Sequence, residues 1–260
     1  LRIQRREASG FRCSCGRPIT ECRFWQDVVR AVRRRGLPFS ECNWTNDYAF
    51  RVGLVGGVFK DYSGQPVLQR LQRWTMALPP YRRRIATADR VNRVYMEAVL
   101  ERTSAEVFFD ASKGLLRAER LMQIPDLDVQ VVRMLRDGRA YAQSLKRRGV
   151  SVREAARQWN AFQLCADRVL EGLPPERLLT LRYEDLCADP RRWCREVCRF
   201  LGVDAFLPPE TLHPSEHHIL GNSMRLGGPM EVRLDEKWRH GLTQNELRAF
   251  ADIAGETNSQ

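Results

Sequence analysis

The chain has 260 residues, of which 43% are hydrophobic and 29% are charged, as in an ordinary globular protein with a full core. No apolar run approaches the length of about 18 residues that a membrane-spanning helix needs, which excludes such a helix here. The formal net charge of +11 favours a polyanionic partner, which could be a phosphorylated nucleotide, an acidic glycan, a nucleic acid or an anionic membrane surface.

A cluster of three cysteines opens the chain after a polar, basic segment. Cys13, Cys15 and Cys22 could bind zinc with a fourth ligand such as Cys42, or could form one disulfide and leave one thiol over. They could also lie in a loop that packs, with nearby aromatic residues, into the core. The later cysteines are interpreted as buried small residues in a reducing compartment, which predicts a cytoplasmic protein. They are Cys165, Cys187, Cys194 and Cys198.

The first part of the chain is expected to be helical with irregular connections. Amphipathic patterns and stop signals predict helices over residues 27–35, 67–76 and 88–102. The pair Pro79-Pro80 is interpreted as the stop of the second of these helices. The glycine- and aromatic-rich connection that precedes the helix at 67–76 is the kind of variable insertion that determines substrate choice in enzymes. Runs of basic residues such as 82–84 are interpreted as solvated helix faces.

The rest of the chain alternates strands with helices. Strands are predicted at 106–110, 129–135 and 178–183, and helices at 115–122, 138–148, 152–171, 191–201 and 244–254. This alternation implies βα units and a parallel sheet. Ligands of such sheets bind at the carboxyl ends of the strands, where Asp110, Arg136 and Tyr183 fall.

The stretch around Arg136 carries the clearest local signal. An apolar, β-branched run ends in a charged turn that contains Gly138, and Ser144 follows Arg136 by eight positions. If a helix begins at the turn, its first N–H groups, the Arg136 guanidinium and the Ser144 hydroxyl could converge on one anion, most naturally a phosphate. The alternative is a solvated helix end.

Three motifs follow one another in the second half of the sequence. The first is Arg136-Asp137-x-Arg139 with Ser144; the second is Arg182-Tyr183-Glu184-Asp185-Leu186, followed by Asp189-Pro190 and Phe200-Leu201-Gly202; the third is Gly221-Asn222-x-x-Arg225 with Trp238 further on. In this order they resemble the sulfotransferases that use 3'-phosphoadenosine 5'-phosphosulfate (PAPS). The segment 13–25 resembles one found in a bacterial branch of that family.

The resemblance implies a fold and a set of nucleotide-binding residues. The expected fold is a three-layer α/β sandwich, in which helices flank a central parallel sheet of the P-loop nucleotide-binding type. PAPS is the implied sulfonyl donor, and no metal is required. The implied nucleotide-binding residues are Arg136 and Ser144 at the 3'-phosphate, with Tyr183 and a loop of Gly221, Asn222 and Arg225 closing over the 3'-phosphate and adenosine.

Two residues are candidates for the chemical step. Lys113, just past a predicted strand end, could neutralise charge near the reacting group, or could be a surface lysine at a helix start. Asp110 could be the base that removes the acceptor's proton, because partial burial favours the protonated form of a carboxyl. Alternatively, Asp110 could cap the turn at Ser112. His217 and His218, in the expected covering loop, could titrate near neutrality.

The resemblance also implies a Gly-rich Ser-Gly-Thr-Thr loop that cradles the 5'-phosphosulfate, and this sequence contains no such loop. The chain is therefore interpreted as one sulfotransferase-like domain over 1–260 that lacks its N-terminal part. Within it, 1–87 would hold the cysteine cluster and a variable helical region, and 88–260 the nucleotide-binding core and covering loop. The alternative is a diverged protein that never had the loop.

The predicted function is transfer of a sulfonyl group from PAPS to a hydroxyl or amine of a carbohydrate, lipid or small-molecule acceptor. The alternative is a non-catalytic nucleotide- or polyanion-binding protein of the same fold. Motifs typical of nucleic-acid-binding domains are missing from the sequence, so a specific nucleic-acid partner is not expected.

Overall fold

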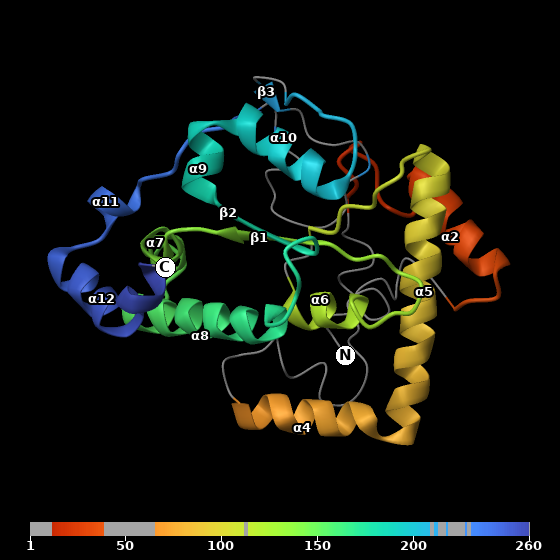
Figure 1. The fold of residues 1–260 in the computed structure, drawn as a ribbon, viewed down its shortest axis with the longest axis horizontal. Helices are drawn as coiled ribbons and strands as arrows, with labels where there is room; N and C mark the ends of the chain where they lie inside the picture. The colour runs from red at the N-terminus through yellow and green to blue at the C-terminus, as the bar shows by residue number, and fades with distance from the viewer. Residues whose placement is uncertain are drawn as a thin grey trace. The chain divides into compact units, whose positions relative to one another are not determined.

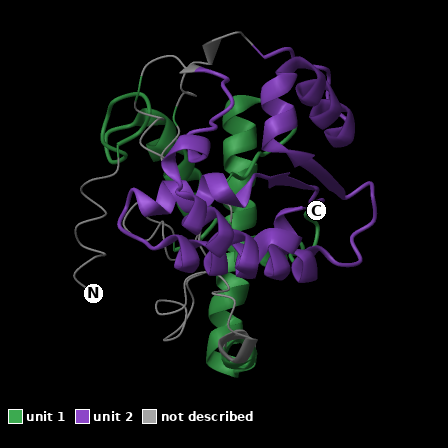
Figure 2. Ribbon diagram, turned by 90° about the vertical axis from the view of Figure 1, so that its left-hand side faces the viewer, with its two compact units in different colours: residues 1–61, 65–127, 213–229 green, residues 62–64, 128–212, 230–260 purple. Residues whose placement is uncertain are grey.

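The computed structural model describes residues 12–38, 66–111, 114–208, 211–212, 217, 227 and 230–259 (Figure 1). The chain divides into two compact units (Figure 2). Unit 1 comprises residues 1–61, 65–127 and 213–229, and unit 2 comprises residues 62–64, 128–212 and 230–260. Within the described residues, no helix combines the length and apolar character that crossing a membrane requires.

Unit 1 is helical in its described part. Its helices are α2 (Arg23–Arg34), α4 (Pro66–Ala77), α5 (Pro79–Thr103) and α6 (Leu115–Leu121). α2 packs on α5 and buries Trp25, Val28, Val29 and Val32, which recur at the spacing of one helix face. The helices predicted at 27–35, 67–76, 88–102 and 115–122 are confirmed, although their ends differ.

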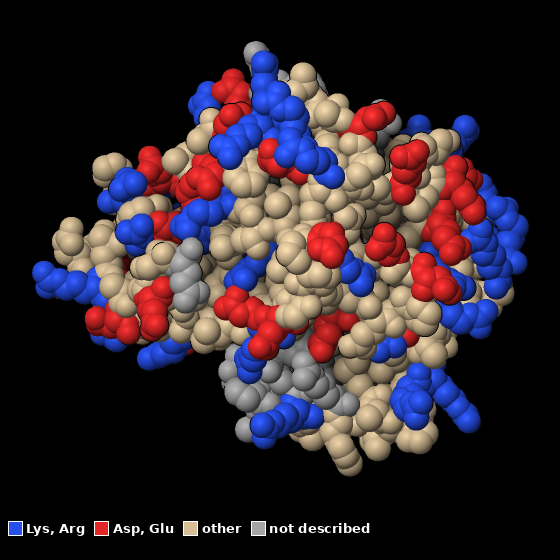
Figure 3. Space-filling model, viewed as in Figure 1, with Lys and Arg blue, Asp and Glu red and all other residues tan. Residues whose placement is uncertain are grey.

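The start of α5 corrects the interpretation of Pro79-Pro80. These prolines do not only stop α4; they occupy the first positions of α5, where a helix has no use for the missing N–H. α5 ends at Thr103, and its C-cap residue Ser104 has a left-handed φ of 53°. The α5 arginines at 82–84 are exposed, in agreement with a solvated face. Figure 3 shows Lys and Arg side chains interspersed with Asp and Glu over the face drawn.

The predicted strand at 106–110 is wrong. These residues form no strand and pair with no strand in the described part of the chain. Phe108 packs edge-on against Tyr95 with ring centroids 5.7 Å apart, but Val107 and Phe109 are exposed. A run of apolar residues becomes a strand only where a neighbouring strand takes up its backbone hydrogen bonds. Asp110 therefore does not lie at the carboxyl end of a strand.

Unit 2 contains a small parallel sheet. Its elements are β1 (Val131–Leu135), α7 (Gly138–Lys146), α8 (Val152–Leu170), β2 (Leu178–Arg182), α9 (Tyr183–Ala188), α10 (Pro190–Leu201), β3 (Thr211–Leu212), β4 (Met230–Glu231), α11 (Trp238–Gly241) and α12 (Gln244–Asn258). β1 and β2 are parallel, with Val131 opposite Leu178 and Leu135 opposite Arg182, and α7 and α8 connect them. The predicted βα organisation is confirmed here. β3 and β4 form a separate antiparallel pair.

The core of unit 2 joins α7, α8 and α12. Trp159 of α8 and Phe250 of α12 lie with ring centroids 6.1 Å apart. Gly138, the first residue of α7, is buried against both rings. A Cβ at this position would lie 2.6 Å from Phe250 and 2.7 Å from Trp159, so only glycine fits. The glycine that marks the turn in the sequence is therefore also a packing requirement.

We expect Gly138→Ala to lower the free energy of unfolding by about 2 kcal/mol or more, because forcing an extra methyl group into a close-packed core usually costs about 1–3 kcal/mol. Urea unfolding followed by circular dichroism measures this change.

The matched control is Gly255→Ala in α12. Its new Cβ would meet Ala251 Cβ at an ordinary 3.7 Å. Because alanine is favoured over glycine in a helix by about 1 kcal/mol, this variant should be slightly more stable than the parent chain. Equal stability of the two variants would contradict the packing account.

Candidate anion-binding site

The register of β1 and β2 brings the sequence-predicted Arg136 and Tyr183 to one edge. Leu135 and Arg182 lie opposite each other at the strand ends, and Arg136 and Tyr183 are the next residues of each chain segment. The Arg136 guanidinium lies over the Tyr183 ring, 4.6 Å from its centroid, as a cation–π pair. The Tyr183 hydroxyl donates a hydrogen bond to the Arg233 carbonyl over 3.0 Å, which fixes the ring under the guanidinium.

Arg136 pairs with one carboxylate among the described residues, and its Nε donor has no partner there. Its Nη2 donates to Asp235 Oδ2 over 3.2 Å, while its Nε is buried and has no hydrogen-bond partner among the described residues. Burial raises the pKa of Asp235, but the Lys237 backbone N–H, the Lys237 charge and Arg136 outweigh it, so its pKa is lowered. The carboxylate that faces Arg136 is therefore ionised at neutral pH, and an anionic ligand would compete with it.

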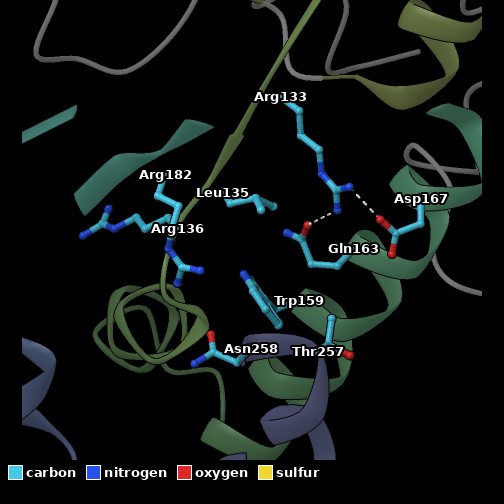
Figure 4. Close-up of a pocket in the computed structure, with 9 residues that line it drawn as sticks. All are labelled: Arg133, Leu135, Arg136, Trp159, Gln163, Asp167, Arg182, Thr257 and Asn258. Carbon is cyan, nitrogen blue, oxygen red and sulfur yellow. Dashed lines mark hydrogen bonds and ion pairs between the residues drawn. The ribbon is translucent and has the colours of Figure 1, made fainter. Parts of the chain in front are cut away.

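A pocket of about 230 Å³ lies beside Arg136 (Figure 4). Residues of β1, β2, α8 and α12 and the residue after β1 line it: Arg133, Leu135, Arg136, Trp159, Gln163, Asp167, Arg182, Thr257 and Asn258. The lining has three guanidinium groups and the carboxylate of Asp167, and Asp235 pairs with Arg136 from outside the lining, so an excess of positive charge remains. Guanidinium groups bind phosphate and sulfate oxygens in bidentate fashion. The lining is suited to a multiply charged oxyanion.

The other two arginines differ in how they are held. Arg133 Nη1 donates to Asp167 Oδ1 over 2.6 Å, and its Nη2 donates to Gln163 Oε1 over 3.1 Å, as the dashed lines of Figure 4 show. These contacts hold the side chain of Arg133, a residue of β1, against α8. Arg182 is half-buried and has no ion pair within the described residues. Its charge remains available to a ligand.

The backbone N–H groups at the start of α7 are already used, which differs from the expectation that they hold an anion. Asp137 is the N-cap, and its carboxylate accepts from the Arg139 N–H over 2.8 Å. The Gly138 N–H donates to Asn258 Oδ1 over 2.6 Å. Because these groups are satisfied by side chains, positive charge for a ligand comes from the arginines instead.

Of the remaining predicted nucleotide-binding residues, the structure describes Ser144 alone. Ser144 lies in α7 with a half-buried side chain and is not among the residues that line the pocket. Gly221, Asn222 and Arg225 lie outside the described residues.

Of the two residues predicted for the chemical step, Lys113 lies outside the described residues. Asp110, in unit 1, accepts from Arg117 Nε over 2.6 Å, and Arg117 Nη1 donates to Asn92 Oδ1 over 2.7 Å. Asp110 is thus part of a buried polar network. It would have to give up its ion pair with Arg117 to act as a base.

Sequence reasoning did not identify Arg133, Arg182 and Asp235 as site residues. The sequence did indicate the first two, because Arg133 lies within an otherwise apolar strand and Arg182 is the last residue of another. A charged side chain in such a strand needs a partner or a ligand. Asp235 has no comparable signal, because its pairing with Arg136 spans 99 positions.

Comparison with known proteins gives matches of one kind. A family model described as "Sulfotransferase family" matches residues 57–207, and one described as "Sulfotransferase domain" matches residues 158–257. Among solved structures, the sulfotransferase domain from the curacin biosynthetic pathway is similar at 20% identity, over 72% of this chain and 77% of that chain, with a TM-score of 0.44. The comparison with curated proteins gives no significant match.

The cap of α7 should make stability depend on pH. Burial raises the pKa of Asp137, but hydrogen bonds from the Arg139 side chain and backbone outweigh it, and the net pKa is lowered. A carboxyl with a lowered folded pKa stabilises the fold above its unfolded pKa of about 3.9, and this contribution is lost as the pH falls through the folded value.

We expect Asp137→Asn, which keeps a good N-cap but removes the charge, to lower the free energy of unfolding at pH 7 by about 1 kcal/mol. The difference from the parent chain should shrink below about pH 4 and disappear toward pH 2. Urea unfolding at a series of pH values measures it, with the exposed Asp252→Asn as control. A difference that does not change with pH would show that the charge is not responsible.

Proposed function

Because the chain belongs to the sulfotransferase family, we propose that it transfers a sulfonyl group from PAPS to a hydroxyl or amine of a carbohydrate, lipid or small-molecule acceptor. The observation that carries the donor assignment is the pocket at the carboxyl edge of β1 and β2, with its three arginines. The longer family match, 57–207, includes both strands and Arg133, Arg136 and Arg182.

The residues of the pocket fit a phosphate group. The buried Nε of Arg136 has no partner among the described residues and offers a donor beside the Nη2 that binds Asp235. A guanidinium that presents two parallel donors matches two oxygens of a phosphate. We assign Arg136 to the 3'-phosphate of the nucleotide, with Arg182 supplying further charge and Tyr183 supporting the Arg136 guanidinium from below.

The other nucleotide-binding residues in this proposal are assigned from the sequence motifs. Ser144 would donate its hydroxyl to the same phosphate, and Gly221, Asn222 and Arg225 would cover the nucleotide. The proposed architecture is a single domain with a three-layer sandwich; the parallel pairing of β1 with β2 supports it.

The chemistry of the proposed reaction sets the demands on these residues. PAPS supplies the sulfonyl group: the acceptor oxygen or nitrogen forms a bond to sulfur, the bond from sulfur to the 5'-phosphate oxygen breaks, and the acceptor loses its proton. Negative charge grows on the departing phosphate, and a nearby cation stabilises it. We propose Lys113 for this role. The base that removes the acceptor's proton stays a prediction, and its candidate is Asp110, which pairs with Arg117 in the structure.

Titration of 3',5'-adenosine diphosphate into the chain, followed by calorimetry, tests the site without requiring turnover. We expect Arg136→Ala to weaken binding by about 2 kcal/mol, roughly 30-fold, because a charge-assisted contact to phosphate is lost. Asp235→Asn should tighten binding, since it removes the carboxylate that competes for Arg136.

Arg157→Ala on α8 is the matched control. Arg157 is exposed and pairs with Glu154 within its own helix, so affinity should not change. If Arg136→Ala binds as tightly as the parent chain, the site assignment is wrong. If the parent chain and a version extended to the start of its reading frame both fail to bind, the nucleotide assignment is wrong. Binding together with release of 3',5'-adenosine diphosphate from PAPS on adding acceptors would support the enzyme over the non-catalytic alternative.

A further inference from the structure

The three cysteines of the N-terminal cluster converge with a histidine from a distant part of the chain. Cys15 Sγ lies 3.8 Å from Cys22 Sγ, and His217 Nδ1 lies 3.3 Å from Cys22 Sγ and 3.7 Å from Cys13 Sγ. All four atoms lie within 4.8 Å of one another. All four residues belong to unit 1. The sequence pointed to the three thiols, but Cys42, suggested as the fourth ligand, lies outside the described residues.

These separations are those of a tetrahedral metal site. Zinc bonds of about 2.3 Å to sulfur and 2.0–2.1 Å to nitrogen place two sulfurs about 3.8 Å apart and a sulfur and a nitrogen about 3.6 Å apart. Three of the six separations, 3.8, 3.3 and 3.7 Å, are close to these edges, and none of the six exceeds 4.8 Å. A disulfide would require sulfurs about 2.05 Å apart. A cluster with two irons would spread its ligands around two metal ions, farther apart than these four atoms.

The local fold presents the thiols to one point. The Gly16 N–H donates to the Cys13 carbonyl over 2.9 Å, and the Cys13 N–H donates to the Arg17 carbonyl over 2.9 Å. This tight turn depends on Gly16, whose φ of +85° favours glycine, and it brings Cys15 back toward Cys13. Cys22 is the N-cap residue of α2, although its side chain makes no capping hydrogen bond. Its thiol is therefore free to face the cluster.

The histidine is held in an orientation that suits a ligand. Its ring stacks on Phe24 with parallel planes and a centroid distance of 4.7 Å, which directs Nδ1 at the thiols. Its backbone φ of 59° lies in the left-handed region, which is uncommon for a residue other than glycine. Such a conformation costs about 1 kcal/mol or more and persists where other contacts fix it. A metal bond to Nδ1 would be one such contact.

We propose that Cys13, Cys15, Cys22 and His217 bind one structural Zn²⁺ ion. Three thiolates and one imidazole are a ligand set that zinc prefers, and four protein ligands leave no open position for a substrate or water. Three thiolates with Zn²⁺ carry a net charge of −1, and Arg12 and Arg17 in the turn can offset it. Cys13 and Cys22 are 0% and 1% exposed, whereas Cys15 is exposed and His217 half-buried, so the ion would be shielded from solvent on the side of Cys13 and Cys22. The cysteines precede both ranges that the family models match.

Metal analysis of the chain, purified without chelators from zinc-supplemented medium, tests this proposal. We expect about one zinc per chain, and cobalt substitution should give the intense visible bands of tetrahedral thiolate-bound Co²⁺. Cys22→Ser and His217→Ala should lose most of the zinc. Cys194→Ser, a cysteine of α10 outside the cluster, should keep it.

His217→Cys separates loss of a ligand from loss of folding. It should retain about one zinc through four thiolates and change the cobalt spectrum, because Cys₄ and Cys₃His are both usual structural zinc sets. A folded parent chain that carries neither zinc nor the cobalt bands would overturn the proposal. So would a His217→Ala variant with the parent's zinc content and cobalt spectrum. The measurement needs no nucleotide, so its outcome is independent of the proposed sulfonyl transfer.

Discussion

The parallel pairing of β1 with β2 is the constraint on which the anion pocket depends. Because Leu135 lies opposite Arg182, the residues that follow the two strands start from the same edge, and the Arg136 guanidinium can rest on the Tyr183 ring. Side chains alternate across a strand, so a slip of the pairing by one residue would place Arg133 and Arg182 on opposite faces of the sheet. The helices α7 and α8, which connect the two strands, pack against each other with Gly138 beside Trp159.

Local patterns predicted most of the described helices and the pair β1 and β2, because hydrophobic period and turn residues are encoded within a few positions. They also predicted Arg136 and Tyr183 at one edge. The strand at 106–110 failed for a non-local reason: an apolar run does not reveal whether a neighbouring strand exists to pair with it. The partners of Arg133 and Arg136, namely Asp167 and Asp235, depend on tertiary packing in the same way.

The cysteine cluster could likewise be predicted from the sequence only in part. Three closely spaced thiols in a turn with glycine were visible in the sequence, and so was the choice between metal, disulfide and packing. The donor that completes a tetrahedral set, His217, could not be told from any other loop histidine, because its role depends on stacking against Phe24 and on contact with Cys22. Neither contact can be predicted from the residues that neighbour His217 in the sequence.

During translation the three thiols emerge long before His217. The 195 positions between Cys22 and His217 correspond to about 10–40 s at usual synthesis rates of about 5–20 residues per second. Over that interval the three thiols of the cluster are present without His217, the histidine that completes the proposed ligand set. In the proposed site, an ion captured early would bind His217 only after the last part of unit 1 is made, so the order of the ligands along the chain would delay closure of the site until most of residues 1–260 have been made.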